Sequence, residues 1–344
     1  MSPTTTTILM SSLASGTIIT MSSHHWLMAW IGLEMNTLAI IPMISKQHHP
    51  RATEAATKYF LTQAAASALI LFSSTVNAWH TGTWDILNST NTTANTLLTM
   101  ALAMKLGLAP MHFWLPEVLQ GSTMKTALII TTWQKLAPMA LIYMTHNNLS
   151  TTILLTMGMI SATLGGWAGL NQTQTRKIMA FSSIAHLGWM AMILTIMPNI
   201  LLINLLLYLT MTTSVFMVLI LLNSKNIKDM MTSWTMSPTI TAMTMLTLLS
   251  LGGLPPLTGF MPKWLILEEL TTQNLTTAAT IMAMSSLLSL FFYLRLSYTS
   301  TITLSPNMTT STHKWRYKHS TSTLLLTLTL PTSLLMLPMT PMLL

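Results

Sequence analysis

The stretch KLGLAPMHFWLP, residues 105–116, contains the features that decide the fold of this chain. It lies within an apolar run that begins near Asn95 and is long enough for a membrane-spanning helix, which needs about 20 mostly apolar residues. Lys105 belongs to the residue types that are most costly at membrane depth. Gly107 and Pro110 follow it closely, and both interrupt helices. The stretch predicts a broken membrane helix with a cation beside the break.

The composition extends this prediction to the whole chain. Of 344 residues, 51% are hydrophobic and only 6% are charged, whereas about a quarter are charged in soluble domains. Apolar runs repeat from end to end and are too long for barrel strands, which have about ten residues. We therefore expect an all-α polytopic membrane protein. The net charge of +8 forms no continuous basic stripe, so no nucleic-acid partner is predicted, and the absence of cysteine excludes thiolate metal sites in this chain.

Eleven membrane-spanning helices are predicted within a single transmembrane domain, residues 1–344. The ninth is overlong because Gly252, Gly253, Pro255 and Pro256 interrupt it. The predicted spans cover residues 3–22, 25–45, 57–80, 95–115, 123–145, 149–170, 177–197, 199–223, 238–267, 276–299 and 323–343.

The basic residues predict the orientation of these spans. Twelve of the fifteen lie in or beside alternate connections, and the intervening connections carry none. Because positive connections stay on the inner side, we expect the N-terminus inside and the C-terminus outside. These residues are Lys46, Arg51, Lys58, Lys125, Arg176, Lys177, Lys225, Lys228, Arg295, Lys314, Arg316 and Lys318.

Four charged residues remain inside predicted spans: Glu34, Lys105, Lys135 and Lys263. A charged residue at the centre of a membrane helix costs roughly 2.5–3.5 kcal/mol, so these four indicate a function or polar partners. A lysine could instead extend its stem to the interface, and Glu34 could stay neutral and hydrogen-bonded. Burial lowers the pKa of a lysine and raises that of a glutamate, and a neighbouring opposite charge reverses both shifts. Such groups can therefore exchange protons. We therefore interpret the four as a proton relay.

The broken spans also suggest an internal repeat. Residues 1–146 and 147–300 each contain five predicted spans, and the fourth of each is broken and carries a lysine. Five is odd, so the second repeat runs through the membrane in the opposite direction, as in ion-coupled transporters. Residues 301–344 form a basic inner loop and a terminal helix. The second repeat has no acid matching Glu34, but His186 lies in its second span.

Histidines raise the alternative of a haem protein. Only His112 and His186 are expected deep in the membrane, and the other eight lie at span ends or in connections. Haem bound by two histidines needs them on facing helices, and this distribution argues against it. No metal site and no nucleotide-binding motif is predicted.

Several segments resemble one protein family. They are WIGLEMNTLAIIP around Glu34, KLGLAPMHFWLPEV around Lys105, TWQKLAP around Lys135, RKIMAFSSIAHLGWM around His186 and GGLPPLTGFMPKW around Lys263. Together they are similar to the antiporter-like membrane subunits of respiratory complex I, which are related to subunits of cation/proton antiporters. The resemblance covers essentially the whole chain.

This resemblance implies a proton-pumping module without a redox centre of its own. Glu34 and Lys105 match the family's charged pair, Lys135 its central lysine and Lys263 the residue leading to the exit, while His112 and His186 match polar positions near the route. NADH, FMN, iron–sulfur clusters and ubiquinone are expected on other subunits of NADH:ubiquinone oxidoreductase.

The resemblance also implies a setting for the chain. The expected partners are other complex I membrane subunits, antiporter-like ones included, and membrane lipids. The expected location is the mitochondrial inner membrane, with the N-terminus on the matrix side and the C-terminus on the intermembrane-space side. Longer relatives have fourteen spans, so this chain is expected to lack three at the N-terminus. Two alternatives stay open: a stand-alone cation/proton antiporter, and a structural spacer whose charges only hold helices together.

Overall fold

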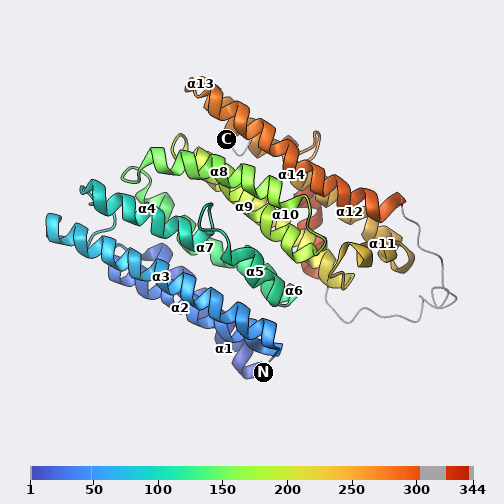
Figure 1. Cartoon of the computed structure of the whole chain (residues 1–344), viewed down its shortest axis with the longest axis horizontal. Coiled ribbons are helices and arrows are strands. Elements are labelled where there is room, and N and C mark those ends of the chain that lie inside the picture. Colours follow the sequence, from blue (N-terminus) through green and yellow to red (C-terminus); the bar gives the residue numbers. More distant parts are fainter. Residues whose placement is uncertain (1, 48, 303–322, 341–344) are drawn as a thin grey trace. The chain divides into compact units, whose positions relative to one another are not determined.

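The computed structural model describes residues 2–47, 49–302 and 323–340, and every regular element in these ranges is a helix (Figure 1). The predicted all-helical class is therefore confirmed. The chain forms two compact units, residues 1–161 and 162–344. Part of the predicted inner loop, with Lys314, Arg316 and Lys318, lies outside the described residues.

The first unit is a bundle of helices (Figure 1). The second helix packs between the first and the third, and the third also contacts α4 and α5. Its helices are α1 (Pro3–Ser22), α2 (Trp26–Ile44), α3 (Pro50–Thr81), α4 (Thr92–Leu106), α5 (Trp114–Gly121), α6 (Met124–Thr131) and α7 (Trp133–Thr145), with the 3-10 turn η1 (Ser45–Gln47). The boundary between the units falls within α8 (Thr151–Gly169).

The second unit surrounds α9, in which almost every residue is buried. Helices α10, α13 and α14 pack against it. The elements of this unit are α9 (Thr175–Leu194), α10 (Pro198–Leu221), α11 (Ile227–Met236), α12 (Pro238–Gly252), α13 (Phe260–Thr272), α14 (Thr276–Ile302), α15 (Leu324–Leu335) and η3 (Leu337–Met339). The sequence did not predict α11. This short helix begins where the Asp229 carboxylate accepts the backbone N–H of Asn226 at 2.9 Å.

Each of the eleven predicted spans coincides with a helix or an interrupted pair of helices among the described residues. Six helices, α2, α3, α8, α9, α10 and α14, are long and apolar enough to cross a membrane. The others are interrupted, shorter or richer in threonine and serine, which lowers their hydropathy. The chain is a multi-pass membrane protein.

The two breaks expected in the fourth spans are present and alike. Helices α4 and α12 each have 15 residues, and each ends at a glycine with a positive φ, 83° at Gly107 and 77° at Gly253. A non-helical segment follows in each case, residues 107–113 and 253–259, before α5 and α13 begin. Glycine suits these ends because an L side chain is strained in the left-handed region.

A third interruption was not predicted. Helix α6 ends at Thr131 and α7 begins at Trp133, inside the expected span 123–145. All three intramembrane lysines therefore lie within one turn of a helix end. Lys105 is in the last turn of α4, whereas Lys135 and Lys263 are in the first turns of α7 and α13.

Candidate functional site

A cavity in the first unit brings Lys105 and Lys135 together. Both side chains are buried, with 6% and 5% of their surface exposed, and both line a cavity of about 20 Å³. The cavity lies among α2, α3, α4 and α7, with α5 and α6 also contributing to its wall. The sequence placed the two lysines in separate spans, and the tertiary structure makes them part of one polar site.

Glu34 lies beside this site rather than in direct contact with a lysine. Its carboxylate is partly buried on α2 and accepts a hydrogen bond from the Thr37 hydroxyl at 3.0 Å, and Thr37 lines the cavity. Glu34 interacts electrostatically with Lys105. Within the described part of the chain, the pair forms no direct ion pair. The two side chains thus interact only at a distance, and their functional pairing stays a prediction.

Three amide side chains around the cavity were missed in the sequence. The Gln134 side-chain N–H donates to the carbonyl of Asn36 at 3.1 Å, and that of Gln63 donates to the carbonyl of Lys105 at 3.5 Å. Asn36 itself is 2% exposed and lines the same cavity. The available signal in the sequence was an uncharged amide within an apolar run, and Asn36 lies only two residues after Glu34. The sequence alone does not show which amides face one another.

Residues within and just after the break that follows α4 donate hydrogen bonds to the last carbonyls of this helix. The Gly107 N–H donates to the carbonyl of Ala103 at 2.9 Å, and the Trp114 indole N–H donates to that of Met104 at 3.1 Å. His112 lies in the break, is 5% exposed, and has its ring centroid 4.4 Å from that of Phe113. His112 does not line the cavity of the two lysines.

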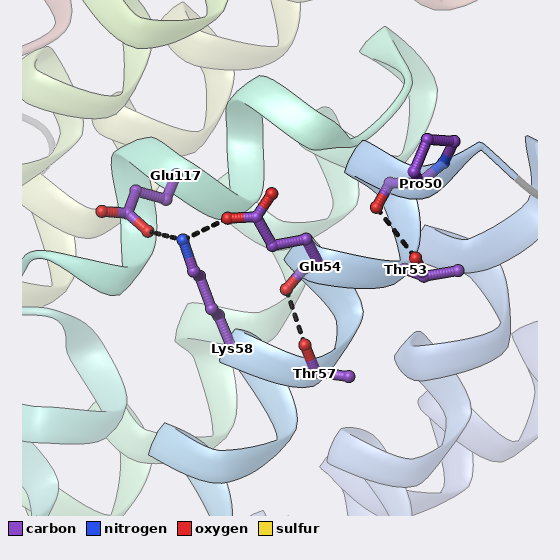
Figure 2. Close-up of polar contacts among 6 residues, drawn as sticks. All are labelled: Pro50, Thr53, Glu54, Thr57, Lys58 and Glu117. Atoms are coloured by element: carbon purple, nitrogen blue, oxygen red, sulfur yellow. Dashed lines mark hydrogen bonds and ion pairs between the residues drawn. The ribbon is translucent and has the colours of Figure 1, made fainter.

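An ion network attaches α5 to α3. The Lys58 ammonium lies between two carboxylates, 2.6 Å from Oε1 of Glu54 and 2.6 Å from Oε2 of Glu117 (Figure 2). Glu54 and Lys58 are one turn apart on α3, whereas Glu117 follows the break in the fourth span. The three side chains are 42–60% exposed. Exposed ion pairs contribute little to stability because water and salt screen them, so this network positions α5 more than it stabilises the bundle.

We expect Lys58→Met to lower the free energy of unfolding of the purified chain only slightly, because only exposed pairs are lost. Thermal unfolding of the variant beside the unchanged chain measures this effect. A drop several times larger would contradict the assignment of Lys58 to a weak surface network.

In the second unit, the Lys263 ammonium donates to the carbonyl of Gly252 at 2.7 Å. This carbonyl belongs to the last residue of α12. Pro256, four residues later, has no N–H to donate to it, and Pro255 likewise has none to donate to the carbonyl of Leu251. The Lys263 ammonium thus replaces the hydrogen-bond donor that the carbonyl of Gly252 lacks at the break. The side chain of Lys263 is partly buried and passes directly over Gly253, where a Cβ would lie 2.9 Å from the Lys263 Nζ.

His186 lies on the buried α9, with 8% of its surface exposed. Its ring centroid is 5.6 Å from that of Tyr208 on α10, and the Tyr208 hydroxyl hydrogen-bonds with Ser183, one turn before His186. The structure therefore places the Tyr208 ring beside His186 and a hydrogen-bonded pair of hydroxyl groups near it. The sequence signal, the SS pair in SSIAH, was present but gave no partner.

Comparisons with known proteins place the chain among membrane proteins of related function. Residues 23–289 match the family described as NADH:quinone oxidoreductase/Mrp antiporter, transmembrane region, and residues 290–344 match the family NADH dehydrogenase subunit 2 C-terminus. A protein named NADH-ubiquinone oxidoreductase chain 2 from Xenopus laevis is 60% identical over 89% of each chain. Its namesake from Struthio camelus is 62% identical over the same shares.

Solved structures agree in fold. A chain of respiratory complex I from Thermus thermophilus with bound aureothin has a TM-score of 0.81 at 28% identity, covering 96% of this chain and 78% of that one. A chain of the Mrp complex from Dietzia has a TM-score of 0.80, covering 87% of this chain and 61% of that one. Its identity of 17% means that this likeness concerns the fold alone.

Proposed function

Because this chain belongs to the NADH:quinone oxidoreductase/Mrp antiporter transmembrane family, we propose that it is a proton-translocating membrane subunit of NADH:ubiquinone oxidoreductase. The observation that carries the proposal is the cavity shared by Lys105 and Lys135. Two buried lysines at one cavity can exchange a proton, which a spacer whose charges only join helices does not require. The names of the relatives support the assignment of this chain to that complex.

The relay that we propose begins at Glu34 and ends at Lys263. A charge change elsewhere in the complex alters the interaction between Glu34 and Lys105, a proton passes from Lys105 to Lys135, and Lys263 releases a proton toward the outer side. His112 and His186 support the route as polar groups. The driving redox chemistry belongs to other subunits, which hold NADH, FMN, the iron–sulfur clusters and ubiquinone.

The energies involved are compatible with this relay. Moving one charge against 100 mV costs about 2.3 kcal/mol. Two unit charges about 4 Å apart interact by about 4 kcal/mol at an effective dielectric constant near 20, and less at longer range. A changed interaction between neighbouring buried groups is therefore large enough to move a proton against such a potential.

The proposed setting is the mitochondrial inner membrane, with the N-terminus on the matrix side and the C-terminus on the intermembrane-space side. The alternate distribution of basic residues supports this orientation. The proposed partners are the other membrane subunits of the complex, antiporter-like ones included, and lipids. A stand-alone cation/proton antiporter is the competing function, since the family includes Mrp antiporters.

Glu34→Gln tests the proposed function in the assembled complex, because the amide keeps the shape of the side chain and removes its titration. We expect fewer protons translocated per NADH oxidised, with assembly and quinone reduction retained. Glu268→Gln, which removes an exposed acid on α13, is the matched control and is expected to change nothing. An unchanged number of protons per NADH in the assembled Glu34→Gln complex would contradict the proposal. Ion flux by the isolated chain in proteoliposomes would favour the stand-alone antiporter.

A further inference from the structure

The segment between α12 and α13 is attached to the helix α15 by a buried hydrogen bond. The hydroxyl of Thr258, which lies in this segment, donates to the carbonyl of Ser333 on α15. Both residues are fully buried. Ser333 is the third residue from the end of α15, so no N–H within that helix can donate to its carbonyl. The Thr258 hydroxyl thus satisfies a buried acceptor that the end of α15 leaves without a helical donor.

Helix α15 is itself packed into the second unit, so it can serve as an anchor. Leu326, in its first turn, belongs to a buried apolar cluster with Val218 and Leu221 of α10. Leu330, one turn later, packs against the same cluster, as does Ile240 of α12. A segment that is bonded to α15 is therefore held against the packed part of this unit.

The start of α13 has few stabilising contacts of its own. Its N-cap position is occupied by Gly259, which has no side chain to accept from the first N–H groups of the helix. Pro262 has no N–H to donate to the carbonyl of Thr258, so the first turn also lacks one regular helical hydrogen bond. The position of this turn therefore depends on contacts outside the helix.

This first turn determines how Lys263 reaches across the break. Gly259 lies so close to α12 that a Cβ on it would collide with the carbonyl oxygen of Ser250. Lys263, four residues later, donates to the carbonyl of Gly252 at 2.7 Å. A shift or rotation of the turn would change this contact, and the hydrogen bond from Thr258 to α15 opposes both movements.

We propose that α15 fixes the second break through Thr258, and that Thr258 is a positioning residue for Lys263. Its hydroxyl holds the start of α13 against α15, and the Lys263 ammonium is thereby kept at the carbonyl of Gly252, where the proposed relay has its last member. This inference rests on the proposed function. It adds an uncharged residue and the last described α-helix to the groups on which translocation depends.

Thr258→Val and Thr258→Ser test the inference in the assembled complex. Valine has nearly the shape of threonine but leaves the Ser333 carbonyl without its donor, whereas serine keeps the hydroxyl. We expect Thr258→Val to slow proton transfer at Lys263 by about tenfold, as for one lost hydrogen bond, and to lower the protons translocated per NADH toward the value of Lys263→Met. Thr258→Ser is expected to retain most of the translocation.

Thr247→Val is the matched control. Thr247 is fully buried on α12, and its hydroxyl donates to the carbonyl of Thr244 in the same helix. The substitution therefore removes a buried hydroxyl without separating two elements, and we expect an unchanged number of protons per NADH. Equal losses in Thr247→Val and Thr258→Val would attribute the effect to any lost buried hydroxyl and overturn the inference.

The outcomes separate this inference from the function on which it rests. If Lys263→Met lowers the number of protons per NADH but Thr258→Val does not, or if the two Thr258 variants behave alike, the positioning role is wrong and the relay stands. If Lys263→Met itself leaves the number unchanged, the proposed role of Lys263 fails.

Experimental maps of the complex test the positioning role without reference to pumping. The map of the unchanged complex should show the Thr258 hydroxyl within hydrogen-bond distance of the Ser333 carbonyl. The map of the Thr258→Val complex should show the Lys263 ammonium displaced from the carbonyl of Gly252. A Thr258 hydroxyl turned away from α15 in the first map, or an undisplaced ammonium in the second, would overturn the inference.

Discussion

Lys135→Met is expected to stop proton transfer through this chain while the complex still assembles and reduces quinone. Lys135 is buried at the cavity that also contains Lys105, so the variant removes the acceptor of the proposed transfer. Proton transfer by a positioned side chain contributes roughly 10²–10⁴-fold to a rate, so we expect a loss of about 100-fold or more in this step. Methionine fills much of the space of the lysine stem, which keeps the packing close to that of the unchanged chain.

Lys135→Arg separates charge from proton exchange. Arginine keeps the positive charge but stays protonated in proteins, so it cannot pass a proton onward. We expect it to pump as poorly as Lys135→Met. The measurement is the number of protons translocated per NADH oxidised by reconstituted complex, beside the rate of quinone reduction. Normal pumping by the arginine variant would mean that Lys135 acts only through its charge.

Gly253→Ala is expected to reproduce the loss of translocation caused by Lys263→Met, although it removes no charge. The added Cβ would lie 2.9 Å from the Lys263 Cδ and Nζ, so the ammonium must leave the carbonyl of Gly252. The backbone is strained as well, because an L residue in the left-handed region costs roughly 1–2 kcal/mol. The proton ratio of the assembled complex measures the effect.

Gly107→Ala is the matched control for this prediction. Gly107 has nearly the same φ, 83°, but the atoms nearest to its Cβ would belong to the Trp114 and Leu115 side chains, at 3.4 Å or more. It therefore carries the strain without touching a lysine, and we expect a smaller loss of translocation. Equal losses in the two alanine variants would attribute the effect to backbone strain and remove the proposed role of the Lys263–Gly252 contact.

The fold could be predicted largely from local features. Apolar runs and nearby glycine and proline residues determine the backbone conformation within a few residues of their own position. The sequence therefore predicted the membrane helices and the breaks near Gly107 and Gly253. The interruption at Thr132 was not, because the sequence there has neither glycine nor an adjacent proline. The short α11 was missed because its ten residues are too few and too polar to register as a membrane span.

Residue types and their spacing were enough to predict an all-helical membrane protein, and they predict Glu34, Lys105, Lys135 and Lys263 as its intramembrane charges. The cost of a charge in hydrocarbon depends strongly on residue type and depth, so a single sequence carries much of that information. The folded structure was needed to show that two of the lysines share a cavity with Asn36, and that Lys263 donates to a carbonyl freed by the break. Those contacts join side chains far apart in the chain, and helix packing, not local pattern, brings them within reach.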